Sequence, residues 1–436
     1  MEDVLICKGA VEEVLSLCNK YETKEGTEPF IGKMSKKIEG IVNSLNEEGF
    51  RVIAVAYKVE KDYKKEYTIS DENELTLLGF MAFLDPPKES SAEAIEKFHK
   101  YNVDVKILTG DNDIVTKKIC KEIKLPIDSI LLGNEIEDMS DEELAEAAEK
   151  TTVFAKLSPM HKERIIKALQ SRNHVVGFMG DGINDAPALK SADVGISVDT
   201  AVDIAKESSD IILLENSLLV LEEGVLEGRR VFGNIVKYIK MTASSNFGNM
   251  FSVIGASIFV PFLPMMPIQV LTNNLLYDVS QTAIPTDSVD EEWIAKPRKW
   301  EISDLKRYIM IIGPISSIFD YTTFFIMLFV FNCWNNPALF QTGWFLESLF
   351  TQTLIIHVIR TNKIPFIQST ASKPLTITSL IIACTGIFLV NSPLADSFGF
   401  TKLPALYYPL LILTLLCYVI LTQVVKNWYV RKYDVQ

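Results

Sequence analysis

Asp181, Asn184 and Asp185 follow directly on the apolar run 175–179, with a glycine on either side of Asp181. Glycines let the chain turn tightly and bring its backbone close to a ligand. Two carboxylates and one amide are hard oxygen ligands, which suit Mg²⁺ and the phosphate groups that accompany it. Because open α/β sheets bind ligands at the carboxyl ends of their strands, this spacing predicts phosphate chemistry assisted by magnesium.

A second expected strand, 103–108, ends in the same way, at Thr109, Gly110 and Asp111. The Thr109 hydroxyl and the backbone beside Gly110 are suited to cradling a phosphate. Lys162 lies near the start of an expected helix, 163–171, where it adds positive charge for a phosphoryl group. A lone Lys or a lone TGD string is common, so the prediction depends on their occurring together with the first motif.

These motifs need an alternating framework to bring them together. Short apolar runs alternate with amphipathic stretches between residues 81 and 235. This order predicts one parallel sheet with right-handed helical crossovers, a Rossmann-like α/β fold. The expected strands 193–197 and 210–213 belong to the same sheet, and a long helix follows them.

Composition divides the chain into an acidic first half and an apolar second half. The 436 residues carry a net charge of −13, which argues against nucleic acid as a partner. Six cysteines show no CxxC pair, so neither a disulfide framework nor a zinc site is indicated. Six apolar segments approach the ~20 residues that span a bilayer. They are 242–262, 265–284, 307–331, 343–359, 375–391 and 404–425.

The charges between these segments predict the orientation. Lys and Arg gather in the second and fourth loops and in the C-terminal tail, whereas 332–342 has neither. By the positive-inside rule, the soluble half and the C-terminus are expected to be cytoplasmic in a multi-pass protein of the cell membrane.

Polar side chains within these apolar segments are costly and mark ion paths by default. Asn246 and Asn249 lie three residues apart, and Asn274 and Asp278 share a helical face. Glu347 lies near the start of the fourth segment. Their oxygens suit Mg²⁺ or Ca²⁺, although hydrogen bonding between helices would also account for Asn249 and Glu347.

The string GDGINDAPAL (180–189) resembles the hinge motif of the P-type ATPases, a branch of the haloacid-dehalogenase-like superfamily. DPPK (85–88) is similar to the family's link between its nucleotide and phosphorylation domains. The resemblance implies a partial nucleotide-binding domain over 1–80, a haloacid-dehalogenase-like phosphorylation domain over 81–235 and an all-α bundle of six transmembrane helices over 236–436.

The resemblance also implies a role for each motif residue, with ATP and Mg²⁺ as cofactors. Lys8, in KGA, and Arg51 would bind the nucleotide, and Asp181 would hold the catalytic Mg²⁺. A catalytic group is implied that comprises Thr109, Gly110, Asp111, Lys162, Asn184 and Asp185.

The segments 267–292 and 344–361 are similar to the magnesium-transporting branch of this family. This similarity assigns the transported ion, Mg²⁺, to Asn246, Asn249, Asn274, Asp278 and Glu347. The lipid bilayer and a divalent cation are therefore the expected partners.

The chain matches only about the C-terminal half of such pumps, because no DKTGT, the motif of the phosphorylated aspartate, and no TGE occur in it. The first hypothesis is the C-terminal part of an ATP-driven magnesium transporter, inactive alone, whose missing N-terminal half is a partner. A second is a non-enzymatic membrane fragment or gene remnant that complements a separate half. A third, a phosphatase fused to an anchor, is disfavoured by the missing nucleophile and the polar helices.

Overall fold

The computed structural model describes residues 3–30, 32–60, 67–84 and 86–433. The chain forms two compact units, Met1–Glu223 and Gly224–Gln436. The first unit is mixed α/β and the second is helical.

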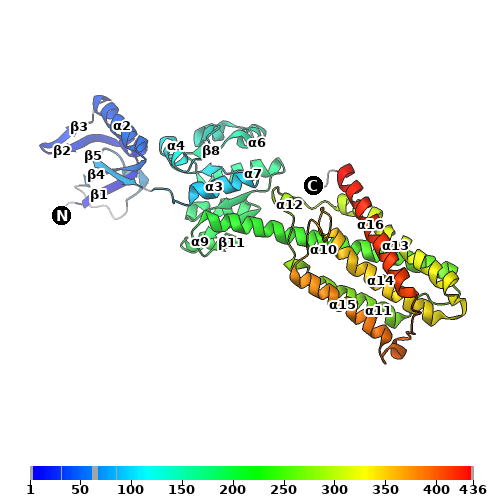
Figure 1. Ribbon diagram of the computed structural model, residues 1–436. Coiled ribbons are helices and arrows are strands. Elements are labelled where there is room, and N and C mark those ends of the chain that lie inside the picture. Colours follow the sequence, from blue (N-terminus) through cyan, green and yellow to red (C-terminus); the bar gives the residue numbers. More distant parts are fainter. Residues whose placement is uncertain (1–2, 31, 61–66, 85, 434–436) are drawn as a thin grey trace. The chain divides into compact units, whose positions relative to one another are not determined.

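The first unit begins with a five-stranded sheet in the order β1-β4-β5-β2-β3. Neighbouring strands are antiparallel except for β2 and β5. Two helices, α1 (Val11–Ser16) and α2 (Gly32–Glu47), pack against the sheet. The longer helix, α2, is labelled beside the strands in Figure 1. The strands are β1 (Asp3–Ala10), β2 (Cys18–Thr23), β3 (Gly26–Pro29), β4 (Phe50–Glu60) and β5 (Leu75–Leu84).

Only one face of this sheet is packed against the helices. Ala54 and Leu75 are fully buried and cluster with Val14 of α1 and with Ile38 and Val42 of α2. Side chains of the other face stay exposed, as the alternating burial along β1 shows. A period of two in burial is the pattern of a strand with one face on a core.

The rest of the first unit contains two parallel three-stranded sheets, in the orders β6-β8-β7 and β11-β10-β9. The single sheet expected from the sequence is therefore divided between β6 and β9 among the described residues. The strands are β6 (Ile107–Leu108), β7 (Ile130–Leu132), β8 (Val153–Ala155), β9 (Gly177–Met179), β10 (Val194–Val198) and β11 (Ile211–Leu213).

The two small sheets are held together by shared side chains. Leu108 and Val176 pack against the hydrophobic clusters of both sheets, and α7 places Ile165 in one cluster and Ile166 in the other. The helices of this region are α3 (Ser91–Lys100), α4 (Asp113–Glu122), α5 (Gly133–Asp138), α6 (Asp141–Lys150), α7 (Pro159–Ser171), α8 (Ala186–Ser191) and α9 (Asp203–Glu207).

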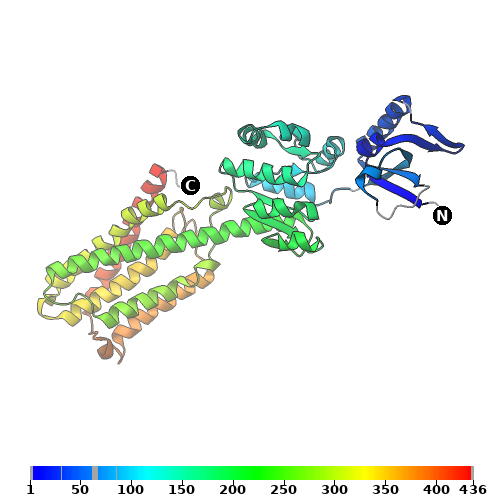
Figure 2. The same ribbon diagram turned by 180° about the vertical axis from the view of Figure 1, so that it is seen from behind.

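In the second unit, long helices lie alongside one another in both views (Figures 1 and 2). Each of the six apolar segments expected from the sequence overlaps a helix, and two of them, 343–359 and 375–391, lie wholly within one. Among the described residues, three helical spans are long and apolar enough to cross a membrane: 302–330, 373–391 and 407–433. The helices are α10 (Leu218–Phe259), α11 (Pro267–Gln281), α12 (Glu291–Ile294), α13 (Ile302–Phe325), α14 (Pro337–Ile359), α15 (Lys373–Asn391) and α16 (Tyr407–Tyr433).

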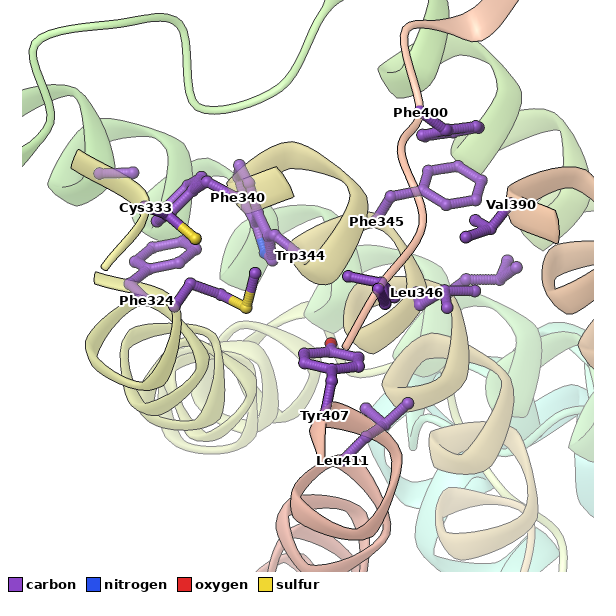
Figure 3. Close-up of a cluster of buried hydrophobic side chains, with 14 of the residues drawn as sticks. Phe324, Cys333, Phe340, Trp344, Phe345, Leu346, Val390, Phe400, Tyr407 and Leu411 are labelled. Carbon is purple, nitrogen blue, oxygen red and sulfur yellow. The ribbon is translucent and has the colours of Figure 1, made fainter. Parts of the chain in front are cut away.

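An aromatic cluster fixes α13, α14 and α16 against one another (Figure 3). Phe324 of α13 packs edge-on against Trp344 of α14, with ring centroids 4.8 Å apart. Tyr407 of α16 donates its hydroxyl to the carbonyl of Gly343 at 2.6 Å. Aromatic pairs of this kind contribute ~0.5–1.5 kcal/mol beyond the energy of the area that they bury. The pair of Phe324 and Trp344 therefore stabilises the packing of α14, the most buried of these helices.

Candidate functional site

The candidate site contains an ion pair between the first turn of α7, which follows β8, and the turn that follows β9. Lys162, in the first turn of α7, donates from Nζ to Oδ1 of Asp185 at 2.7 Å. Ser158 caps this helix and Pro159 begins it, which holds the first turn in place. The Lys162 and Asp185 side chains are 14% and 12% exposed, so the pair is partly shielded from water. Positive charge is thereby fixed at the end of β9.

The glycines around Asp181 make this geometry possible. The backbone N–H of Gly182 donates to Oδ2 of Asp185 at 3.1 Å. A Cβ on Gly180 would lie only 2.6 Å from the Asp185 Cβ, so any larger residue would displace that carboxylate. Ser197 of β10 donates its hydroxyl to the Gly180 carbonyl at 3.0 Å, which fixes the turn to the neighbouring strand.

Asp181 and Asn184, which lie on the same turn, are exposed. The two carboxylates of this motif therefore differ in environment, because Asp185 is engaged by Lys162 while Asp181 faces solvent. A solvent-facing carboxylate beside an amide is a suitable ligand set for Mg²⁺, which binds through one or two carboxylates and keeps several waters.

The second strand end predicted from the sequence folds into a compact turn after β6. The Asp111 N–H donates to the Thr109 hydroxyl at 3.1 Å, and that hydroxyl lies 3.2 Å from Asp111 Oδ2. Gly110 is exposed beside them. Arg51 forms an ion pair with Asp111 at 3.0 Å, which places a predicted nucleotide-binding residue next to a predicted catalytic one.

Lys8 and Arg51 lie on one face of the five-stranded sheet. Lys8 pairs with Val55 across β1 and β4, and Arg51 lies four residues earlier on β4, so their side chains emerge on the same side. The strand rise separates them by about 13 Å along β4. This is the face that no helix of the cluster covers, and it exposes Ile6, Met81 and Phe83.

The predicted ion-binding residues of the second unit are divided between surface and interior. Asn246, Asn274 and Asp278 are exposed, whereas Glu347 is fully buried and Asn249 is half-buried. Asn274 and Asp278 do share a face of α11, as expected, but the structure does not bring them together with Glu347. Asn249 instead contacts Gln352 of α14, at 3.4 Å.

Glu347 belongs to a buried polar group that sequence reasoning did not assemble. The carboxyl group of Asp320, on α13, neighbours that of Glu347, and Asp320 accepts hydrogen bonds from Ser252 at 2.6 Å and from Trp344 at 2.7 Å. Both carboxylate oxygens of Glu347 lack a hydrogen-bond donor. Among the described residues, no group of three or more His, Cys, Asp or Glu side chains is placed to hold a metal.

A buried carboxylate at the ends of several helices was also missed. Asp287, whose side chain is fully buried, accepts hydrogen bonds from Lys237 at 3.0 Å and from Arg360 at 2.8 Å. The backbone N–H of Ser372 donates to its other oxygen at 3.0 Å. Asp287 therefore connects α10, the linker after α11, the end of α14 and the start of α15.

Burial alone would raise the pKa of the Asp287 carboxyl, but the bonds and charges of Arg360 and Lys237 outweigh it and lower the pKa. Burial also lowers the pKa of Lys237, against the attraction of Asp287. The sequence signal was weak, because Asp287 lies in an acidic stretch, TDSVDEE, that reads as a solvated loop.

Comparison with known proteins gives the family. Residues 1–90 match the family model for the cytoplasmic domain N of P-type ATPases, and residues 262–428 match that for the C-terminus of cation-transporting ATPases. The chain is 53% identical over 435 residues to "Magnesium-transporting ATPase, P-type 1" of Escherichia coli strain K12, covering 99% of this chain and 48% of that protein.

Two further relatives are also cation-transporting ATPases by name. The protein of that name from Salmonella typhimurium strain 14028s is 52% identical, with 99% of this chain and 48% of the relative covered. "Calcium-transporting ATPase 1" of Lactococcus lactis is 32% identical, with 73% of this chain and 37% of the relative covered. The chain thus spans about half the length of the magnesium-transporting relatives it matches. The chain belongs to the cation-transporting P-type ATPases.

Proposed function

We propose that this chain supplies the nucleotide-binding, phosphate-handling and ion-conducting parts of an ATP-driven magnesium transporter. The observation that carries the proposal is the Lys162–Asp185 pair beside the exposed Asp181, on a unit followed by apolar helices. The names of the relatives, both magnesium-transporting ATPases, support magnesium as the ion.

ATP is proposed to bind on the uncovered face of the five-stranded sheet. The exposed Ile6, Met81 and Phe83 offer an apolar surface for an adenine ring. Lys8 and Arg51 emerge on the same face and offer cations for phosphate oxygens. Gly79 of β5 has open space above it, which leaves room for a flat ring system.

At the strand ends, each residue has a distinct proposed role. Lys162, fixed by Asp185, would neutralise charge on a phosphoryl group, and the turn at Thr109 and Gly110 would hold its oxygens. Asp181 and Asn184 would hold Mg²⁺, which when bound supplies positive charge to a transferring phosphoryl group. The residues present fit this ion, since an exposed carboxylate and amide suit a partly hydrated Mg²⁺.

The divided sheet supports a haloacid-dehalogenase-like phosphorylation domain that is completed by another segment. β6 pairs only with β8, and β9 pairs only with β10, among the described residues. The free edges of β6 and β9 therefore present unpaired backbone groups. Thr109 lies just after β6, and Asp181 lies just after β9. We propose that a strand bearing the nucleophilic aspartate, from the part of the relatives that this chain does not cover, pairs between β6 and β9.

In the second unit, six membrane spans are proposed, from α10, α11 and α13–α16. Both the positive-inside pattern and the cytosolic location of ATP favour a cytoplasmic soluble unit and C-terminus in the cell membrane. The exposed stripe of Asn274 and Asp278 on α11 would then line an ion path with helices from the uncovered part of the relatives.

Nucleotide binding tests the proposal on the chain itself. A fluorescent trinitrophenyl-ATP would be titrated against the purified chain in lipid nanodiscs. Each charged contact to phosphate contributes ~1.5–3 kcal/mol, so Lys8→Ala and Arg51→Ala are each expected to weaken binding by about 10-fold to 150-fold. The matched control is Lys37→Ala, on α2 against the opposite face. Equal affinities for all four proteins would refute the assigned site.

A further inference from the structure

A cavity of about 540 Å³ lies between three helices of the second unit. Its walls come from α10, from the segment between α12 and α13, from the first turns of α13 and from the last residue of α16. More cations than carboxylates line it: Lys240, Arg298, Lys299 and Arg307, with Glu301 and Asp304. This excess of positive charge favours an anionic occupant.

One of the two carboxylates is already engaged within the protein. Lys240 forms an ion pair with Oδ2 of Asp304 at 3.4 Å, and Tyr429 donates its hydroxyl to Oδ1 at 2.6 Å. The Lys240 ammonium also lies 4.8 Å from the centre of the Tyr308 ring. Because Asp304 is neutralised by Lys240, it does little to offset the charge of the two arginines.

Both arginines lie over aromatic rings, and neither forms an ion pair with a carboxylate of the described residues. The guanidinium of Arg298 lies 4.7 Å from the centre of the Trp293 ring, and that of Arg307 lies 4.5 Å from the centre of the Tyr433 ring. Nε of Arg298 is buried and has no acceptor within the described part of the chain. A buried donor without a partner is costly, so it calls for an acceptor. The planar fork of a guanidinium matches the oxygens of a phosphate group.

The cavity lies at the ends of apolar spans. Lys240 lies just before the apolar segment of α10, Arg307 begins that of α13, and Tyr433 lies beyond that of α16. Trp300, which is 48% exposed, adds an indole ring 5.9 Å from the ring of Phe232. Tryptophans gather at the headgroup level of a bilayer, and basic pockets between membrane helices bind lipid head groups. The position therefore favours a phosphate that belongs to a lipid.

We propose that Arg298 and Arg307 form a binding site for a phosphate group in this cavity, supplied by the head group of an anionic phospholipid. The two guanidinium groups would hold the phosphate oxygens. Because α10, α13 and α16 all line the cavity, an occupied site would hold the ends of these three helices together. The inference goes beyond ion transport and does not depend on which ion is carried.

The test measures lipid bound to the purified full chain in an uncharged detergent, by native mass spectrometry. Phosphatidylglycerol is the probe, and diacylglycerol with the same acyl chains is the control that lacks the phosphate. Arg298→Gln and Arg307→Gln are each expected to weaken phosphatidylglycerol binding about tenfold or more, because each removes a charged hydrogen-bond donor. The matched control is Arg230→Gln, an exposed arginine of α10 outside the cavity, which should leave binding unchanged.

Glu301→Gln provides a gain of binding that a folding defect cannot imitate. This variant removes an acid from the wall of the cavity, so phosphatidylglycerol should bind about twofold to fivefold more tightly. Weaker binding in Glu301→Gln would contradict an anionic occupant.

Competition with glycerol phosphate distinguishes the two sources of the phosphate. If glycerol phosphate displaces the lipid from the original chain but does not bind Arg298→Gln, the site takes a free phosphate ester and the assignment of the two arginines holds. If the lipid stays bound, the head group is the ligand. Equal binding of diacylglycerol and phosphatidylglycerol, or equal affinity of the Arg298, Arg307 and Arg230 variants, overturns the inference and leaves nucleotide binding and ion transport untouched.

Discussion

Replacing Asp287 with asparagine tests how much the helical unit depends on one buried charge. The change keeps the size of the side chain but leaves the cations of Lys237 and Arg360, both largely buried, without their counter-charge. Breaking a buried pair in this way costs ~3–5 kcal/mol. At ~2–4 °C per kcal/mol for a unit of this size, the melting temperature should fall by about 6–20 °C.

The assay is thermal unfolding of the chain in nanodiscs, followed by tryptophan fluorescence. The control is Asp396→Asn, an exposed carboxylate of the same unit, which should stay within ~0.5 kcal/mol of the original protein. Adding Lys237→Met to Asp287→Asn should recover part of the loss, because one stranded cation is removed. A melting temperature within ~2 °C of the original for Asp287→Asn would refute the reasoning.

The same variant makes a pH prediction whose sign follows from the lowered pKa of Asp287. A carboxyl whose folded pKa lies below its unfolded value stabilises the protein above the unfolded pKa, ~3.9. The stability gap between the original chain and Asp287→Asn should therefore be constant from pH 7 to about pH 4. It should close as pH falls further, and a gap that widened in acid would contradict the assignment.

Gly180→Ala should destabilise the first unit by ~1–3 kcal/mol, because its methyl group would lie 2.6 Å from the Asp185 Cβ. Gly32→Ala, at the start of α2 in the same unit, is the control in thermal unfolding, because the added Cβ meets nothing within 4 Å. Equal effects of the two substitutions would contradict the close packing. Lys426→Met should cost the second unit ~1.5–3 kcal/mol, because the Lys426 ammonium donates to the carbonyls of Val358 and Thr361 at the end of α14. The exposed Lys402→Met is the control for that loss, and a Lys426 variant as stable as Lys402→Met would show that those hydrogen bonds contribute little.

Patterns with a strong local cause were predictable from the sequence. The apolar segments gave helices, because length and hydropathy are local properties. The strand before Asp181 and the helix after it were predicted from an apolar run, glycines and a proline near the helix start. By contrast, no element boundary was predicted for β2, β3 and α2. A signal was available for α2, since Met34, Ile38 and Val42 recur at a spacing of four and pack in the cluster under the sheet.

Side-chain partners depend on which faces meet, which the sequence does not specify. Asn273 and Asn274 are adjacent amides, and only packing against α14 shows that the first is buried and the second exposed. Ser348 and Gln352 are polar residues at a spacing of four in α14, but the helix also carries Glu347, Thr351 and Thr353, so their spacing alone did not single them out. The division of the parallel strands into two sheets depends on tertiary pairing and was not predicted.

The most direct test of the proposed function joins this chain to a polypeptide that supplies the DKTGT and TGE motifs and reconstitutes both in liposomes. ATP hydrolysis and Mg²⁺ movement would be measured while the divalent ion on the far side of the membrane is varied. The account predicts ATP-driven Mg²⁺ movement that responds to that ion and is abolished by Asp181→Asn. ATP cleavage at a rate indifferent to every divalent ion offered there would contradict it.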